Sequence, residues 1–309
     1  MKYMCVDAGT ANCPCIMAEM KGCLVCSKLS AEEVCDCEWM GVCIYNEFVQ
    51  NGCEVRDVRE NFRSRILNKK YYGEDVLVME LEVPSGFVLQ AFGPGKFIFV
   101  KPVDEKDYYN MPVSIMAADH DRGSITIAVK ILSAKSKRVA DAKEWLEVRG
   151  IYRNGLLGKG LSDMEHDRKH GGSWLIITKG IGIAPAIKLL SWAGKKVKVD
   201  LLSDTDKISE ELLDDCLAGF RDAANIHIKK IDLANDLKNL NSDIMNQYDR
   251  IIILTSNYFI KTIANKFKIS EDKLVCCNNF NMCCGEGICG ACCYTNSKGE
   301  MYKTCKCRI

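Results

Sequence analysis

Four cysteines near the end of the chain are spaced for binding iron. Cys284 and Cys289 are separated by four residues, Cys289 and Cys292 by two, and Cys292 and Cys305 by twelve. This C-x4-C-x2-C…C pattern is typical of a [2Fe-2S] cluster ligated by thiolates. Glycines between the ligands let the backbone approach a cluster without Cβ clashes; they are Gly285, Gly287 and Gly290. The sequence therefore predicts a [2Fe-2S] cluster whose metal ligands are Cys284, Cys289, Cys292 and Cys305.

A zinc ribbon is the alternative interpretation of this segment. Zinc would favour two closely spaced cysteine pairs, and Cys289 with Cys292 supplies one of them. The second pair would have to come from Cys305 and Cys307 or from Cys276 and Cys277. Cys307 is also a rival to Cys305 as the fourth ligand of an iron-sulfur cluster.

A second group of cysteines lies near the start of the chain, arranged largely as CxC and CxxC pairs. It consists of Cys13, Cys15, Cys23, Cys26, Cys35, Cys37 and Cys43. Short pairs of this kind can supply two thiolates to one metal. Because the group follows no standard spacing, three interpretations stay open: a second iron-sulfur cluster, a zinc ion, or thiols that are reduced or redox-reactive.

Composition narrows the chemistry that these cysteines could serve. Of 19 cysteines, nine lie at or before Cys53, nine lie from Cys276 onward, and Cys216 stands alone between them. A disulfide-stapled secreted protein would spread its cysteines through a small fold, so metal binding in a reducing compartment is favoured. The chain shows no secretory pattern and no apolar run near the roughly 18 residues of a membrane span, which predicts a cytoplasmic protein. With 42 basic and 41 acidic residues, neither nucleic acid nor a membrane surface is an expected partner.

Between the two cysteine groups, the hydrophobic pattern changes once. Six short runs rich in β-branched and aromatic residues predict an antiparallel barrel or sandwich, at 63–72, 76–83, 95–102, 112–117, 124–131 and 145–152. After Gly171, apolar strands alternate with amphipathic helices, which is typical of a doubly wound α/β domain. The expected strands are 174–180, 196–203, 226–231 and 250–256, and the expected helices are 184–194, 208–220, 235–248 and 258–267.

The first strand of the α/β region runs into a glycine-rich turn. Gly180 and Gly182 precede a helix whose Pro185 suits a first turn. Backbone N–H groups and the positive end of the helix could bind an anionic cofactor here. The glycines could equally serve only the packing of the turn.

Together these features resemble the ferredoxin reductase superfamily over about residues 60–309. The matching segments are FGPGKFIFV at 92–100, PVSI at 112–115, GLLGKG at 155–160, GIGIAP at 180–185 and the cysteine loop. The chain is most similar to the electron-transfer subunits of dihydroorotate dehydrogenase, sulfide dehydrogenase and ferredoxin:NADP oxidoreductase. The resemblance implies an FAD-binding β-barrel at 53–160, an NAD(P)-binding-like α/β domain at 171–273 and a [2Fe-2S] segment at 274–309. The cysteine-dense residues before them are expected to form a separate Cys-rich metal-binding segment at 1–52.

The resemblance also implies which residues hold FAD. The flavin ring and phosphates would lie near one strand of the barrel, at Met111, Pro112, Val113 and Ser114. The next strand and a short helix would complete the site with Ala128, Val129, Lys130, Lys135 and Ser136, and either lysine could meet the pyrophosphate charge. Ser114 and the two lysines could instead be ordinary strand and surface residues.

The chain departs from the family in three places. Met111 stands where the family has an arginine, the stretch LSAKS at 132–136 has no glycine, and Leu254-Thr255-Ser256-Asn257 replaces a Cys-Gly-Pro near the nicotinamide. Asp204 is a candidate for reading the nucleotide ribose, although capping of the following helix from the surface is the expected role. His166 and His170 are expected in a solvated linker.

The expected function is that of an oxidoreductase subunit. Electrons would pass between NAD(P)H, FAD and the [2Fe-2S] cluster, to or from a partner that holds the substrate chemistry. That partner would be a dihydroorotate dehydrogenase-like or glutamate synthase-like flavoprotein, or ferredoxin. A redox or metal sensor that keeps the fold without nicotinamide turnover is the alternative, and a zinc-binding interaction protein is a third possibility.

Overall fold

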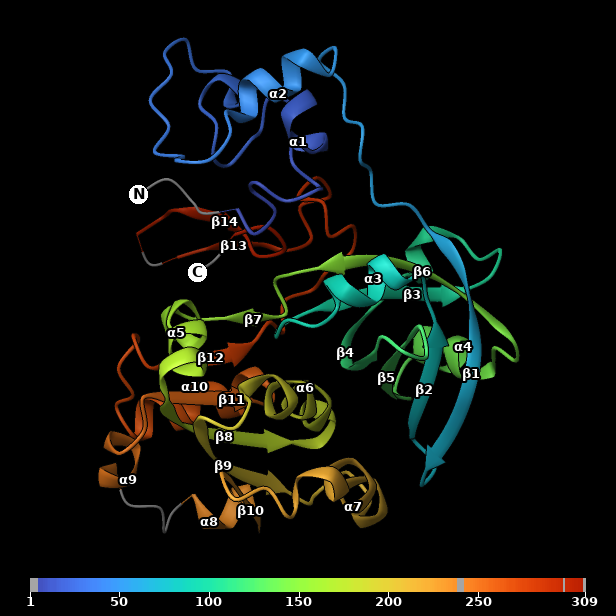
Figure 1. Ribbon diagram of the computed structural model, residues 1–309, viewed down its shortest axis with the longest axis vertical. Coiled ribbons are helices and arrows are strands. Elements are labelled where there is room, and N and C mark those ends of the chain that lie inside the picture. The colour runs from blue at the N-terminus through green and yellow to red at the C-terminus, as the bar shows by residue number, and fades with distance from the viewer. Residues whose placement is uncertain (1–4, 238–241, 297, 308–309) are drawn as a thin grey trace. The chain divides into compact units, whose positions relative to one another are not determined.

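The computed structural model describes residues 5–237, 242–296 and 298–307 (Figure 1). The chain forms two compact units. The cysteine-rich unit comprises Met1–Phe62, Tyr152–Asn154 and Phe280–Ile309, and the barrel-sheet unit comprises Arg63–Ile151 and Gly155–Asn279. Both cysteine groups at the two ends of the sequence therefore belong mainly to one unit.

The first half of the barrel-sheet unit is a closed barrel with the strand order β1-β2-β5-β4-β3-β6. Its strands are β1 Phe62–Tyr72, β2 Val76–Glu82, β3 Phe97–Pro102, β4 Met111–Asp119, β5 Ser124–Lys130 and β6 Trp145–Tyr152. Alternate residues of β2 point inward, and Leu77, Met79 and Leu81 are fully buried. Two helices accompany the strands, α3 Ser85–Gln90 and α4 Ala134–Asp141. The expected six-stranded barrel is confirmed.

The second half is a sheet with the order β10-β9-β8-β11-β12-β7, in which only β7 is antiparallel to its neighbour. Its strands are β7 Leu156–Leu157, β8 Gly172–Lys179, β9 Val197–Asp204, β10 Ile226–Ile231, β11 Arg250–Leu254 and β12 Leu274–Cys277. The chain order reverses between β8 and β11, which is where a doubly wound sheet forms its binding crevice. The expected α/β domain is confirmed.

Helices cover both faces of this sheet. Trp174 and Ile176 of β8 pack into one core with α6 Ile183–Ala193 and α7 Glu210–Leu217. Leu175 and Ile177 of the same strand pack into a second core with α10 Asn257–Lys266. Because successive strand residues point to opposite faces, β8 is apolar throughout, as its sequence indicates.

Three local features differ from the expectations. The helix expected over 235–248 is two short helices, α8 Leu233–Asp236 and α9 Ser242–Asn246, and residues 238–241 lie outside the described part. Residues 274–277, expected in the cysteine segment, form β12 and pair with β11. His166 and His170 lie on a helix, α5 Met164–His170, rather than in a linker, with their exposed rings 4.4 Å apart.

The barrel and the sheet share one hydrophobic core. Met116 and Ala128 of the barrel belong to the same cluster as Ile183 and Ile187 of α6. Polar contacts add to this packing, because the Tyr72 hydroxyl donates to Asp215 at 2.7 Å and Lys70 forms an ion pair with the same carboxylate. The start of α6 and the strand β4 are thereby held beside each other.

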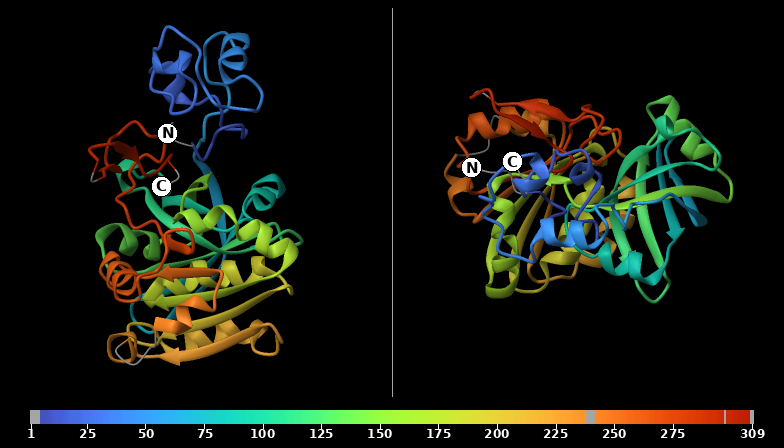
Figure 2. Two further views of the ribbon diagram at one scale, coloured as in Figure 1. Left: turned by 90° about the vertical axis from the view of Figure 1, so that its left-hand side faces the viewer. Right: turned by 90° about the horizontal axis from the view of Figure 1, so that it is seen from above.

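The cysteine-rich unit has little regular structure. Its described elements are α1 Ile16–Glu19, a 3-10 turn Lys28–Ser30, α2 Ile44–Gln50, and the hairpin of β13 Cys293–Thr295 with β14 Met301–Lys303. The first and last segments of the chain, blue and red in Figure 2, meet at a β-bridge between Cys5 and Cys307. In the described part of the chain, no helix is long and apolar enough to cross a membrane.

Candidate functional site

The loop from Cys284 to Cys292 is shaped by glycines with left-handed backbone angles. The φ angles of Gly285, Gly287 and Gly290 are 72°, 76° and 73°. A Cβ on Gly287 would also lie 2.6 Å from the sulfur of Met17. Side chains other than glycine rarely adopt such angles, so the tight course of the loop requires these residues. The loop also supplies a donor, because the backbone N–H of Glu286 donates to the Cys284 sulfur at 3.3 Å.

The four predicted ligands form two pairs of thiols. The Sγ atoms of Cys292 and Cys305 share a hydrogen bond at 3.1 Å. Cys289 is hydrogen-bonded to the thiol of Cys284, and Cys284 acts electrostatically on Cys305, so the two pairs are neighbours. The β13–β14 hairpin returns the chain to make this possible, and Thr304 binds the carbonyl oxygen of Cys292 through both its backbone N–H and its hydroxyl.

These contacts favour the thiolate form at two of the four positions. The hydrogen bond with Cys305 lowers the pKa of Cys292 to about 6, and the same bond raises the pKa of Cys305. Burial by itself would raise the pKa of Cys289, but hydrogen bonds from the Ala291 and Cys284 backbone and from neighbouring thiols outweigh it and lower the pKa. Thiolates are the form that binds metals.

The rival ligands are placed differently. Cys307 is fully buried at the β-bridge with Cys5, and burial raises the pKa of its thiol. Cys276 and Cys277 lie on β12 of the barrel-sheet unit and pack against its core. Cys305, and not Cys307, is the residue whose sulfur contacts Cys292.

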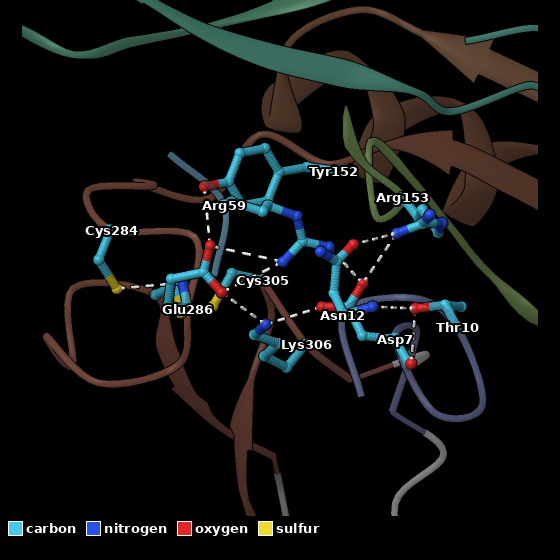
Figure 3. A network of polar contacts seen from close by, with 11 residues as sticks. Asp7, Thr10, Asn12, Arg59, Tyr152, Arg153, Cys284, Glu286, Cys305 and Lys306 are labelled. Carbon is cyan, nitrogen blue, oxygen red and sulfur yellow. Dashed lines mark hydrogen bonds and ion pairs between the residues drawn. The ribbon is translucent and has the colours of Figure 1, made fainter. Parts of the chain in front are cut away.

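A buried network of charged side chains surrounds this loop (Figure 3). Glu286, near the start of the loop, accepts from Arg59 at 3.2 Å, from Lys306 at 2.9 Å and from the Tyr152 hydroxyl at 2.8 Å. Asp7 accepts from Arg59 at 2.6 Å and from Lys306 at 2.7 Å. Arg153 also reaches Asp7, at 3.2 Å. The network fastens the cysteine loop to the segment around residue 7.

The network holds three cations and two carboxylates. Burial by itself would raise the pKa of Asp7, but Lys306 and Arg59 outweigh it and lower the value to about 2. The pKa of Glu286 is lowered in the same way, and the pKa of the fully buried Lys306 is raised by Asp7 and Glu286 despite its burial. The excess of one buried positive charge beside the thiols suits an anionic group bound there.

The arrangement of the thiols bears on the kind of metal group that fits. Among residues 5–237, 242–296 and 298–307, no three His, Cys, Asp or Glu side chains gather to hold a metal ion. In a [2Fe-2S] cluster each iron takes two thiolates, and two neighbouring pairs of thiols fit that requirement.

The residues expected to bind FAD lie at the start of β4, on β5 and at the start of α4. On β4, Pro112 and Ser114 face outward from the barrel, whereas Val113 is buried and Met111 is partly buried. Lys135 donates to the carbonyl oxygen of Asn110 at 3.2 Å, so a cation lies beside the start of β4. The side-chain oxygen of Asn110 is buried without a hydrogen-bond partner in the described part of the chain.

The other expected FAD ligands have structural contacts. Ala128 packs into the core shared by the barrel and the sheet, and Val129 is buried on the same strand. Lys130 forms an ion pair with Asp75 at 2.5 Å and donates to the carbonyl oxygen of Lys207. The Ser136 hydroxyl takes part in the capping box that begins α4. Among the residues expected to bind FAD, Lys135 is the one whose charged group lies beside the start of β4.

The two glycines of the turn after β8 differ in what they allow. A Cβ on Gly182 would lie 2.0 Å from the carbonyl oxygen of Leu254, so this glycine permits the close approach of α6 to the end of β11. Gly180 has a φ of 60° and no atom within 4 Å of a Cβ placed on it. The turn therefore lies at the reversal of strand order, with open space above Gly180.

The expected role of Asp204 is wrong. Asp204 is fully buried, forms an ion pair with Lys179 at 2.8 Å and accepts from the backbone N–H of Leu233. The following helix α7 is instead capped by Ser209, whose side chain accepts from Leu212. Asp204 thus links Lys179 of β8 to the first residue of α8 from a buried position, and it does not cap α7 from the surface.

Solved structures identify the architecture. The NADH-dependent reduced ferredoxin-NADP oxidoreductase studied for flavin-based electron bifurcation aligns with a TM-score of 0.58 at 16% identity, over 78% of this chain and 85% of that one. The chain has the ferredoxin reductase fold. The ferredoxin reductase of carbazole 1,9a-dioxygenase aligns with a TM-score of 0.53 at 12% identity, over 73% of this chain and 71% of that one. Phthalate dioxygenase reductase, described as a modular structure for electron transfer from pyridine nucleotides to [2Fe-2S], aligns with a TM-score of 0.51 at 15% identity, over 78% of this chain and 75% of that one.

No protein-family model matches the sequence, and no curated protein matches it.

Several residues of interest in this ferredoxin reductase fold were not predicted. Asp7, Arg59 and Lys306 belong to no local motif, and Asp7 and Lys306 are 299 positions apart. Lys188, on α6, is buried with its Nζ 5.4 Å from the ring centre of Phe92, and burial lowers its pKa to about 8. The only signal for it in the sequence is a lysine within an otherwise apolar helix.

Replacement of Lys306 tests the network. In the Lys306→Met variant Asp7 and Glu286 lose a buried partner while Arg59 still contacts both, and we expect the cysteine-rich unit to be destabilised by about 1–3 kcal/mol. Lys298→Met, which alters an exposed lysine of the same segment, should change stability by less than about 0.5 kcal/mol. Hydrogen exchange of amides in the cysteine-rich unit measures both. Equal protection in the two variants would contradict the proposed importance of the network.

Proposed function

We propose that this chain is an electron-transfer oxidoreductase subunit that uses FAD and a [2Fe-2S] cluster. The observation that carries the proposal is the pairing of the four thiols, Cys284 with Cys289 and Cys292 with Cys305. The ferredoxin reductase fold supports it, because solved proteins of this fold include reductases described as passing electrons from pyridine nucleotides to [2Fe-2S].

The two cofactors would divide the electron chemistry. A bound flavin supplies the exchange between two-electron hydride transfer and the one-electron steps of an iron-sulfur centre. The cysteine thiolates would ligate the irons, and the N–H of Glu286 would donate to the sulfur of Cys284, a contact that tunes the potential of such centres. Lys306 and Arg59 would add positive charge near the cluster.

The barrel-sheet unit would bind the flavin and the nucleotide. Lys135 would offer a cation to the flavin phosphates, and the unpaired oxygen of Asn110 would accept from a flavin hydroxyl. Met111, Pro112 and Ser114 of the same strand would line the site. The turn at Gly180 and Gly182 would bring backbone N–H groups at the start of α6 to an NAD(P)H phosphate.

The substrate chemistry would belong to a partner. The two cofactor sites would account for electron transfer within this chain. A dihydroorotate dehydrogenase-like or glutamate synthase-like flavoprotein, or ferredoxin, is the class of partner that we propose. A role in pyrimidine biosynthesis would follow if the partner is of the first kind.

A second function is favoured by the end of β11. There the carbonyl oxygen of Thr255 accepts from the Cys277 thiol at 3.1 Å and from the Asn279 side chain at 2.7 Å, beside the Thr255-Ser256-Asn257 sequence that replaces the family motif. A redox sensor would bind the cofactors without oxidising or reducing a nicotinamide, so it would tolerate these side-chain contacts at the end of β11, where the family motif lies near the nicotinamide. The two functions make different predictions. In the oxidoreductase, NADH or NADPH reduces the bound flavin; in the sensor, neither nucleotide does.

Replacement of one predicted iron ligand tests the cluster. Cys292→Ser removes a sulfur from the Cys292–Cys305 pair. We therefore expect the EPR signal of a reduced [2Fe-2S] centre to disappear and the iron content to fall by roughly two irons per chain. Cys293→Ser alters the exposed neighbouring cysteine and should leave both unchanged. An intact signal in Cys292→Ser would rule out this ligand set.

Replacement of Lys135 tests the flavin site. Without the ammonium group, we expect the Kd for FAD to rise about tenfold, equivalent to roughly 1.4 kcal/mol. The matched control is Lys137→Met, which alters an exposed lysine of the same helix and should leave the Kd within about twofold. Titration of FAD-depleted protein, followed by flavin fluorescence, measures both. A Kd unaffected by Lys135→Met would argue against FAD phosphates at the start of α4.

A further inference from the structure

The carboxyl ends of three parallel strands meet beside the turn at Gly180. In the strand register, Lys179 of β8 is the partner of Asp204 of β9, and Asp204 is the partner of Ile231 of β10. The three strands therefore end at the same edge of the sheet (Figure 1). Because the turn at Gly180 follows Lys179 directly, the residues that follow β9 lie beside the proposed phosphate site.

Asp204, the last residue of β9, is fully buried and has both carboxylate oxygens occupied. Its Oδ2 accepts from Lys179 Nζ and from the backbone N–H of Leu233, both at 2.8 Å. Its Oδ1 accepts from the backbone N–H of Asp206 at 2.7 Å. Asp204 therefore has no oxygen left for a ribose hydroxyl, and it fixes the backbone at Asp206 instead.

Asp206 is a carboxylate at this edge that a ligand can reach. Its side chain is 59% exposed, and its Oδ2 accepts from Lys179 Nζ at 3.0 Å. Among the residues that the structure describes, none donates to its Oδ1. The Lys179 side chain is only 11% exposed and is paired with both carboxylates, so its charge is already neutralised.

Negative charge predominates around Asp206. Asp232 follows β10 at the same edge, where Lys179 acts on it electrostatically. Lys207 is exposed and follows Asp206 in the sequence, so it is a cation that a phosphate group could reach. Three carboxylates, those of Asp204, Asp206 and Asp232, thus stand against the two lysines.

A dinucleotide bound at this edge would place its two halves on opposite sides of β8. The resemblance to ferredoxin reductases places the nicotinamide beside Thr255, just after β11. With the pyrophosphate at the turn of Gly180, the adenosine half would extend over the end of β9, on the other side of β8. In dinucleotide-binding folds an acidic residue near this position accepts a hydrogen bond from the ribose 2′-hydroxyl, the group that carries a phosphate in NADPH.

We infer that Asp206 makes the nucleotide site selective for NADH over NADPH. This inference rests on the proposed function, because it assigns the nucleotide of the same site. The Oδ1 of Asp206 would accept from the 2′-hydroxyl of the adenosine ribose, with the carboxylate held in place by Lys179. The 2′-phosphate of NADPH would meet a like charge and lose that hydrogen bond, and both effects favour NADH.

Binding of redox-inactive nucleotide fragments tests this selectivity separately from electron transfer. Full-length protein reconstituted with FAD is titrated with ADP-ribose and with 2′-phospho-ADP-ribose in an isothermal titration calorimeter. We expect ADP-ribose to bind about tenfold more tightly, because the phosphate meets like charge at Asp206. The isosteric Asp206→Asn change removes this charge and should bring the two Kd values to within about threefold of each other.

Asp222→Asn is the matched control. Asp222 is also an exposed aspartate, but it precedes β10 and so lies at the opposite edge of the parallel sheet. Its replacement removes the same charge from the chain and should leave the preference for ADP-ribose at about tenfold, because the site is distant.

Three results would overturn the inference: equal or tighter binding of 2′-phospho-ADP-ribose, no binding of either fragment, or an unchanged preference in Asp206→Asn. If the phosphorylated fragment binds more tightly and Lys207→Met removes that preference, Lys207 and not Asp206 sets the selectivity. Binding of ADP-ribose with the expected preference, without reduction of the flavin by NADH, would support this inference and contradict the proposed oxidoreductase function.

Discussion

The cysteine-rich unit depends on the pairing of two carboxylates, the buried Asp7 and the partly buried Glu286, with the buried cations Arg59 and Lys306. Asp7 and Glu286 lie at opposite ends of the sequence, yet both accept from Arg59 and from the fully buried Lys306. Removing a carboxylate would enlarge the excess of positive charge, and removing Lys306 would leave Arg59 as the one cation shared by Asp7 and Glu286; either change costs more than the pairing contributes over an apolar alternative. The interaction is thus weak as a source of stability and strong as a constraint on which segments meet.

This constraint has a consequence for cofactor chemistry. Lys306 lies between Cys305 and Cys307 in sequence, and its charge also acts on Cys5 and Cys15. This buried ammonium group would therefore raise the reduction potential of the proposed [2Fe-2S] cluster, because positive charge favours the form with the extra electron. Burial of the network keeps that effect from being screened by salt.

Local patterns in the sequence were enough for much of this structure. The six barrel strands are short runs rich in β-branched and aromatic residues, and Cys284, Cys289 and Cys292 lie within one loop whose glycines allow its turns, so both could be predicted. Asp7 and Lys306 could not be paired, because they are 299 residues apart and belong to no motif. Asp204 was misjudged because its partner Lys179 comes from a neighbouring strand, and a polar residue after a strand otherwise suggests a cap. The four residues of β12 were too few to show a period.

In the proposed function, electrons would pass between a nicotinamide, a flavin and the cluster at Cys284, Cys289, Cys292 and Cys305. The most direct test is an anaerobic titration of the reconstituted full-length chain with NADH or NADPH, followed by flavin absorbance and by EPR of rapidly frozen samples. We expect at least one nucleotide to bleach the flavin and then to produce the signal of a reduced [2Fe-2S] centre. Reduction of both centres by dithionite, with no reduction of either centre by NADH or NADPH, would rule out this electron path.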